Sequence, residues 1–221
     1  MQQQSLLLAS SSPRRRELIA WLNIPFAVAA ADIDESRQSG EHAMGHVRRL
    51  AREKAEKIWN DNHPASIILA ADTIVIKDDQ ILGKPKDKEQ ATRMLALLRD
   101  TMHQVVTAIC LIQPDGREMQ DVCTSTVHMR NYSDQEIKRY VVSGDPFDKA
   151  GGYAIQNGSF NPVLKFQGCF ASVMGFPFCH IERALRKIDG YNWIPVAEIC
   201  QKNLPYDCPI CTKVLNGEDI G

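Results

Sequence analysis

The sequence predicts an α/β fold built on a mixed β-sheet with flanking helices. Segments with the two-residue periodicity of strands alternate along the chain with segments that have the 3.6-residue periodicity of helices. Two apolar segments, VVTAICLI and REMQDVCTSTVHM, face each other across the turn QPDG, a pattern typical of an antiparallel hairpin. Because hairpins occur among alternating strands and helices, we expect a mixed rather than a purely parallel sheet.

The first half of the chain carries clear helix and strand signals. Ser12 is a good N-cap residue and Pro13 suits the first position of a helix. SLLLA is a short apolar segment, and IILAADTIVI is apolar and rich in β-branched residues, as expected of a buried strand. The expected strands cover 5–9, 67–76 and 81–82, and the expected helices cover 13–22 and 41–59.

The second half adds helices with recognisable starts. Asp87 and Gln90 are spaced as a capping box, and so are Ser133 and Glu136. We expect helices over 87–99, 133–142 and 178–188, the hairpin described above, and a strand near 163–173. The segment GDPFDKAGGYAIQNGS is rich in turn residues and is expected to be a loop.

Composition limits the class of protein. The chain has 221 residues, of which 44% are hydrophobic and 24% are charged, with a net charge of −1. This balance argues against a binder of nucleic acid polymers or membrane surfaces, and no apolar segment approaches the roughly 20 residues that span a bilayer. Seven cysteines without a signal peptide indicate reduced thiols and a cytoplasmic location. We expect one domain over 1–189 and a Cys-containing C-terminal tail over 190–221.

Three arginines follow Pro13 in SSPRRRELI, where a helix begins. A helix start carries unpaired N–H groups and a partial positive charge, so cations there are unfavourable unless a bound anion neutralises them. Phosphate is such an anion, because helix N–H groups and guanidinium groups both bind it. Arg14, Arg15 and Arg16 are therefore either part of a phosphate site or solvated side chains on an exposed turn.

Two charged residues occur where apolar ones are expected. Lys54 lies in the apolar stripe of the helix over 41–59, where it either snorkels to water or serves a site; the stripe alone predicts that Lys54→Met is neutral or stabilising for the fold. Asp72 interrupts a buried strand, which is costly unless the carboxylate is paired or bound to metal. Lys84 follows just beyond, and Glu35 provides a second carboxylate.

The segment DKAGGYAIQ carries paired glycines that allow a ligand to approach the backbone, with Asp148, Lys149 and Gln156 as polar groups. Viewed alone, it is equally an ordinary turn. Taken together, these basic and acidic residues are what metal-assisted phosphoryl or nucleotidyl chemistry requires. The sequence contains no GxxxxGK[ST], HExxH or GxGxxG motif.

The same stretches resemble the Maf family of nucleoside triphosphate pyrophosphatases. The resemblance covers about residues 5–188 and runs in order through LASSSPRRRELI, RLAREKA, AADTIVI, ILGKPKD, HQVVTAICL, GDPFDKAGGYAIQ and MGFP. It implies a fold related to the inosine triphosphate pyrophosphatases, with a central cleft across the sheet. It also implies an enzyme that uses Mg²⁺ or Mn²⁺ to hydrolyse nucleoside triphosphates to the monophosphate and pyrophosphate, removing surplus or non-standard nucleotides as a homodimer.

The resemblance also assigns roles to individual residues. Asp72 matches the proton acceptor, Lys54 and Lys84 match the phosphate-binding lysines, and Glu35 matches a further acidic residue. Because carboxylates bind Mg²⁺, we expect Glu35 and Asp72 to hold the metal ion. Ser10 and Arg15 fall in the phosphate-binding motif. The positions linked to base choice read Arg14, Thr73 and Gln156, which is similar to the branch selective for dTTP and UTP.

Two alternatives concern function. The family has been associated with arrest of septum formation, so the chain is alternatively a nucleotide-binding regulator of cell division that acts through a protein partner. The full set of carboxylates and lysines favours turnover over sensing. In the tail, Cys200, Cys208 and Cys211 include one CxxC, which is half of a structural zinc site, and the sequence leaves open whether it binds zinc.

Overall fold

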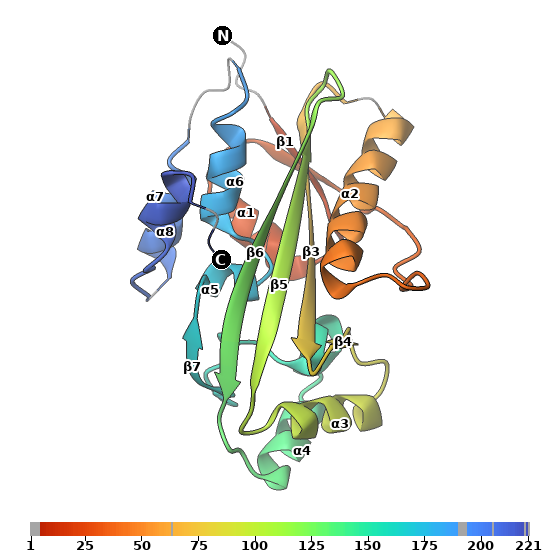
Figure 1. Cartoon of the computed structure of the whole chain (residues 1–221), viewed down its shortest axis with the longest axis vertical. Coiled ribbons are helices and arrows are strands. Elements are labelled where there is room, and N and C mark those ends of the chain that lie inside the picture. The colour runs from red at the N-terminus through yellow and green to blue at the C-terminus, as the bar shows by residue number, and fades with distance from the viewer. Residues whose placement is uncertain (1–4, 63, 190–193, 205, 219, 221) are drawn as a thin grey trace.

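The computed structural model describes residues 5–62, 64–189, 194–204, 206–218 and 220. Its centre is a seven-stranded sheet with the order β2-β1-β3-β5-β6-β7, to which β4 is joined at β3 (Figure 1). The strands are β1 (Leu6–Ala9), β2 (Phe26–Ala29), β3 (Ile67–Lys77), β4 (Gln80–Leu82), β5 (Met102–Ile112), β6 (Glu118–Met129) and β7 (Val163–Gln167). β1 is parallel to β2 and β3, whereas the other neighbours pair antiparallel, so the predicted mixed sheet is confirmed.

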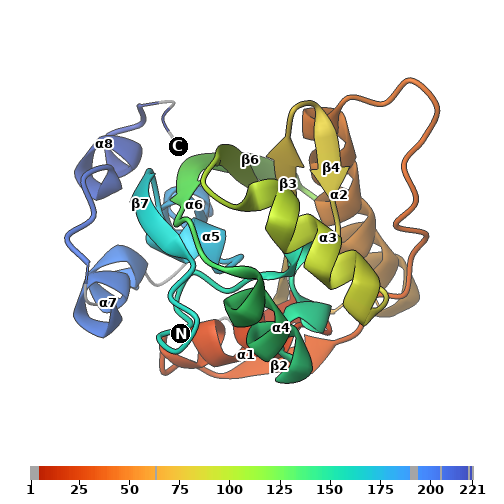
Figure 2. The ribbon, with the colours of Figure 1, turned by 90° about the horizontal axis from the view of Figure 1, so that it is seen from below.

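Helices cover both faces of the sheet and one end of it. The helices are α1 (Pro13–Ala20), α2 (Ala43–Asn62), α3 (Lys88–Leu98), α4 (Asp134–Val142), α5 (Phe170–Val173), α6 (Phe178–Leu185), α7 (Val196–Asn203) and α8 (Cys211–Leu215), with 3₁₀ turns η1 (Asp145–Asp148) and η2 (Ala150–Gly152). Alternate side chains of β3 face opposite layers, because Ile67 and Leu69 pack with α1 and α6, whereas Ile68 and Ala70 pack against α2. α3 and α4 lie at the lower end, as the view from below shows (Figure 2).

Some local expectations were wrong. The strand expected over 163–173 ends at Gln167, because the chain turns at Gly168 (φ +118°), where a Cβ would lie 2.7 Å from Ser125 Oγ, and then forms α5. The capping box at Asp87 is incomplete: Asp87 accepts from Gln90 N, but the Gln90 side chain accepts from Lys86 N instead. The sequence patterns also missed β2, α5, α7 and α8. The capping box of Ser133 and Glu136 is confirmed.

One edge of β3 has a gap in its strand pairing. β1 pairs with β3 as far as Ala70, and β4 begins to pair with it at Val75. Between these points, no strand among the described residues pairs with that edge, whereas β5 follows the other edge from Ile68 to Ile76. Asp72 and Thr73 lie in this gap and point to opposite faces of the sheet.

The C-terminal helix α7 packs against the apolar cluster that contains α6. Val196 and Cys200 are buried in the same apolar cluster as Phe178 of α6. The buried Glu182 of α6 accepts a hydrogen bond of 2.6 Å from the backbone N–H of Ala197, which caps the start of α7. Residues 190–193, where the expected domain boundary falls, lie outside the described residues. No helix in the described ranges has the length and apolar character needed to cross a bilayer.

Candidate active site

A cavity opens at the gap in β3, and residues from both sides of the sheet line it. All nine residues to which the resemblance assigns a role lie in its wall: Ser10, Arg14, Arg15, Glu35, Lys54, Asp72, Thr73, Lys84 and Gln156. They come from the end of β1, the first turn of α1, the segment before α2, α2 itself, β3, the residues after β4 and the segment after η2. Only the fold brings these separate stretches together.

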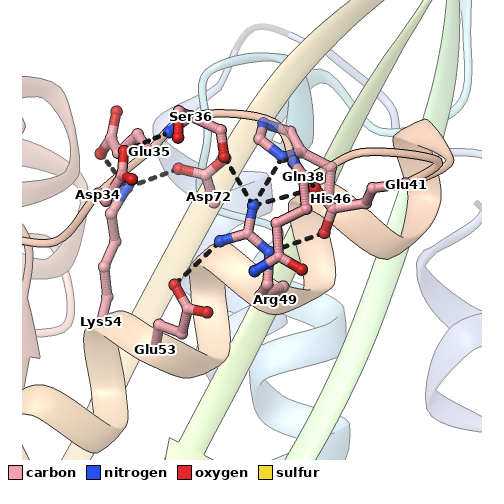
Figure 3. Close-up of polar contacts among 10 residues, drawn as sticks. All are labelled: Asp34, Glu35, Ser36, Gln38, Glu41, His46, Arg49, Glu53, Lys54 and Asp72. Atoms are coloured by element: carbon pink, nitrogen blue, oxygen red, sulfur yellow. Dashed lines mark hydrogen bonds and ion pairs between the residues drawn. The ribbon is translucent and has the colours of Figure 1, made fainter.

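Lys54 joins the two acidic residues of the cavity. Its Nζ lies 2.6 Å from Glu35 Oε1 and 2.7 Å from Asp72 Oδ1 (Figure 3). The side chains of Lys54 and Asp72 are only 9% and 11% exposed, so the ion pair replaces much of the hydration that both charges lose. Lys54 therefore does not snorkel to bulk water. An ammonium has three N–H donors, and the third is left for an anion in the cavity.

The cations of the cavity keep Glu35 ionised. Partial burial acts to raise the pKa of Glu35, but the hydrogen bond from Lys54 and the positive charges of Lys54, Lys84 and Arg15 outweigh it, so the pKa is lowered. Asp72 uses Oδ1 for Lys54, and its Oδ2 has no hydrogen-bond partner among the described residues. That oxygen is available to accept a proton from a ligand or a water molecule.

Arg15 is buried and held by a chain of hydroxyl groups. Its Nη2 donates to Thr73 Oγ1 (2.9 Å), which lies 2.9 Å from Thr107 Oγ1. Because Thr107 donates its own proton to Ser172 O (2.8 Å), Thr73 must donate to Thr107. The only hydroxyl proton of Thr73 is thereby used inside the protein, so Thr73 orients Arg15 and has no proton left for a ligand.

Arg14 fixes the amide of Gln156. With the amide oriented to satisfy its neighbours, its oxygen accepts from Arg14 Nε (3.0 Å) and Nη2 (2.8 Å). Arg14 Nη1 also donates to Glu17 Oε2 at 2.5 Å. The part of the Gln156 amide that is left for a ligand is therefore its NH₂ group, which is a donor. Of the three arginines at the helix start, only Arg16 is exposed, so the interpretation as a solvated side chain applies to this residue alone.

Sequence reasoning missed several residues of the wall. The Gly175 carbonyl accepts from Arg15 Nε (2.9 Å), and a Cβ at this glycine would approach that guanidinium to 3.4 Å. His46 lies eight residues before Lys54 on the same face of α2, a helical spacing that offered a signal. Tyr153 lines the cavity while its hydroxyl lies 2.7 Å from Nε2 of the buried His103, and no sequence pattern pointed to this pair.

Glu35 and Asp72 fit a divalent cation. Mg²⁺ is commonly held by one or two carboxylates together with substrate phosphates and water, which is the donor set that this cavity offers. Within the described residues, no group of three or more His, Cys, Asp or Glu residues is arranged to hold a metal ion by itself. The tail cysteines, including Cys208 and Cys211, are free thiols and do not form such a group.

Comparisons with known proteins show the family of the chain. The model of the family described as "Maf-like protein" matches residues 5–188. The chain is 42% identical over 186 residues to a dTTP/UTP pyrophosphatase of Geotalea uraniireducens, covering 83% of this chain and 95% of the relative. It is 42% identical over 208 residues to a dTTP/UTP pyrophosphatase of Thermomicrobium roseum, covering 94% and 93%.

Two solved structures show a weaker likeness, each at 16% identity. One is a dITP/XTP pyrophosphatase of Mycobacterium abscessus (TM-score 0.39, covering 58% of this chain and 76% of that one). The other is the Ham1 protein of Staphylococcus aureus (TM-score 0.41, covering 58% and 73%). The family match spans most of the chain and includes every residue named above in the cavity wall, so the chain belongs to the Maf family.

Proposed function

We propose that the protein hydrolyses nucleoside triphosphates, with dTTP and UTP favoured, to the nucleoside monophosphate and pyrophosphate. The observation that carries this proposal is the ammonium of Lys54 between the carboxylates of Glu35 and Asp72, in a cavity that Arg15 and Lys84 also line. Cations of this kind neutralise phosphate oxygens, and an adjacent carboxylate accepts the proton of an attacking water. The names of the similar relatives support the same reaction.

Asp72 serves as the proton acceptor. A water molecule attacks the α-phosphorus, its proton moves to Asp72 Oδ2, and the bond from that phosphorus to the oxygen that bridges to the β-phosphate breaks. The bonding electron pair leaves on the bridging oxygen, so pyrophosphate departs and the monophosphate remains. Lys54, Lys84 and Arg15 stabilise the negative charge that develops on the phosphate oxygens. Lys84 has no ion pair or hydrogen bond within the described ranges, so its charge is free for the substrate.

Glu35 and Asp72 would hold a Mg²⁺ or Mn²⁺ ion. A bound divalent cation neutralises triphosphate charge and makes a water molecule more acidic. The carboxylate of Glu35 is kept ionised by its cationic neighbours, which suits a metal ligand. A homodimer and a cytoplasmic location stay predictions of the sequence.

Base choice follows from the amide of Gln156. Because Arg14 occupies the amide oxygen, the NH₂ group is the part that meets the base, and it pairs with a carbonyl oxygen of uracil or thymine. The amide oxygen, which Arg14 holds, is not left to accept from N3–H of the base. A site built on such hydrogen bonds rejects a base that leaves its polar groups unpaired.

Hydrolysis of UTP in ¹⁸O-labelled water tests the reaction directly. Attack at the α-phosphorus predicts that the label appears in UMP and that unlabelled pyrophosphate forms in an equal amount, with little turnover when Mg²⁺ and Mn²⁺ are absent. Label in pyrophosphate, or orthophosphate as the main product, would show that a different bond is cleaved.

A further inference from the structure

The segment that carries Glu35 has little apolar packing of its own. Residues 30–42, here called the Glu35 loop, connect β2 to α2 without a helix or strand. From 34 to 40 every residue is exposed, and among residues 30–40 only Ala31 and Ile33 are partly buried. Apolar burial therefore does not fix the backbone on either side of Glu35, and polar contacts must do so.

Arg49 of α2 provides those contacts. Its Nε lies 2.7 Å from Glu41 Oε1, and its Nη2 lies 3.0 Å from Glu41 Oε2 (Figure 3). The same Nη2 donates to the backbone carbonyl of Ser36, the residue after Glu35, at 2.9 Å. The Arg49 side chain is only 17% exposed, so these bonds are largely shielded from water. One guanidinium thus holds the loop at two points, next to Glu35 and at the loop's end.

Glu41 extends the network within the loop. Its Oε2 also accepts from Gln38 N (3.1 Å) and lies 3.0 Å from His46 Nδ1, and its backbone carbonyl accepts from Arg37 Nε (2.8 Å). The hydrogen bond from Arg49 is the main reason that the pKa of Glu41 is lowered to about 2. Glu41 therefore stays ionised and bound to Arg49 at any pH near neutrality.

We propose that Arg49 is a positioning residue that acts through Ser36 and Glu41 to hold Glu35 beside Lys54 and Asp72. This inference rests on the proposed function, because it concerns how the acidic residues of that site are arranged. Arg49 does not line the cavity. Its effect on turnover is transmitted through the backbone that it fixes, in the way that outer residues orient metal-binding carboxylates in other proteins.

Arg49→Met tests the proposal, with Arg52→Met as the matched control. Arg52 lies on the same helix and makes ion pairs with Glu56 and Glu118, but its side chain is 52% exposed and no described contact joins it to the loop. Arg49→Met is expected to lower kcat/KM by about 10–100-fold and to raise the Mg²⁺ concentration for half-maximal activity. Arg49→Lys, which lacks the forked donor geometry, should recover only part of the loss.

Hydrogen exchange distinguishes a local loss of order in the Glu35 loop from a loss of stability of the whole fold. Arg49→Met should increase amide exchange across residues 34–41 and leave β5 and β6 as protected as in the wild type. Unchanged exchange in the loop would overturn the proposal, and so would loss of protection throughout the sheet. This measurement needs no nucleotide, so it gives a result even if the wild type releases no pyrophosphate, which would instead refute the proposed function.

A double-mutant cycle with Glu35→Gln completes the test. If Arg49 acts through Glu35, Arg49→Met should cost far less activity in the Glu35→Gln background than in the wild type. Equal fold-losses in both backgrounds would mean that Arg49 acts independently of Glu35, which contradicts the proposal.

Discussion

At the scale of single residues, the site depends on charges that would be unfavourable alone. Lys54 lies in the apolar stripe of α2, and Asp72 interrupts a buried strand. Their ion pair offsets the cost of burying each charge. The sequence identified both residues as out of place, because periodicity reveals a charged residue on an apolar face. It could not reveal their 2.7 Å contact, which requires α2 to lie across β3.

Asp72→Asn should keep the fold and most nucleotide binding but lower kcat by roughly 10²-fold or more, because an amide cannot take up the proton of the attacking water. Steady-state kinetics with UTP, together with the affinity for a non-hydrolysable analogue, checks this expectation. Asp79→Asn, at the exposed turn after β3, is the control and should remain active. If Asp72→Asn kept full turnover, another group would have to be the base.

Lys54→Met should destabilise the protein as well as impair catalysis. The apolar stripe alone predicted a neutral or stabilising effect, but the substitution leaves the carboxylate of Asp72 with little water and no cation. We expect a loss of about 1–3 kcal/mol in the free energy of unfolding. Lys57→Met, at an exposed ion pair one turn further along, should change it little. Equal stability of the two variants in urea unfolding would contradict this reasoning.

At the scale of elements, the sequence predicted those with strong periodicity and failed where tertiary contacts decide. β3, β5, β6, α2 and α4 occur where their patterns predict them. β2 was missed because FAVA is a short edge strand, and its pairing with β1 is what defines it. Phe170–Val173 looked like a continuation of β7, but the turn at Gly168 directs it into α5.

His103 of β5 should make stability depend on pH. Burial, assisted by the charge of Lys77, lowers the pKa of His103 from 6.5 to about 4. Between these values the unfolded chain binds a proton that the folded protein does not, so stability is full above pH 6.5 and falls as the pH drops toward 4, by up to about 3 kcal/mol. His103→Gln should flatten this decline in thermal unfolding, whereas His42→Gln, at an exposed position, should not.

α7 should contribute to stability rather than to catalysis. Val196 is fully buried against the main apolar cluster, whereas Glu198 on the same helix is exposed. Val196→Ala should therefore lower the melting temperature while leaving kcat/KM of the folded enzyme unchanged, and Glu198→Ala should affect neither. Deletion after residue 195 should be more destabilising, since it also removes Cys200 from the cluster. A truncated protein with wild-type melting temperature would contradict this account.

At the scale of the whole molecule, the site exists because the strand pairing of β3 is interrupted. β1 ends opposite Ala70 of β3 and β4 begins to pair with it at Val75, which leaves Asp72 and Thr73 accessible from the cavity. The resemblance to a family identified the nine residues, but only the fold shows that Thr73 orients Arg15 and that Arg14 orients Gln156. Hydrogen-bond partners distant in sequence leave no periodic signal, which is why residue patterns alone could not assign these roles.

If the NH₂ group of Gln156 selects the base, this cavity binds a pyrimidine nucleoside triphosphate that carries a carbonyl opposite Gln156. The most direct test is kcat/KM for pyrophosphate release from dTTP, UTP, CTP, GTP, ATP, ITP and 7-methyl-GTP under identical Mg²⁺ conditions. We expect dTTP and UTP to be the best substrates, with kcat/KM for the purine nucleotides lower by about 10²-fold or more. A clear preference for 7-methyl-GTP or ITP would contradict this expectation.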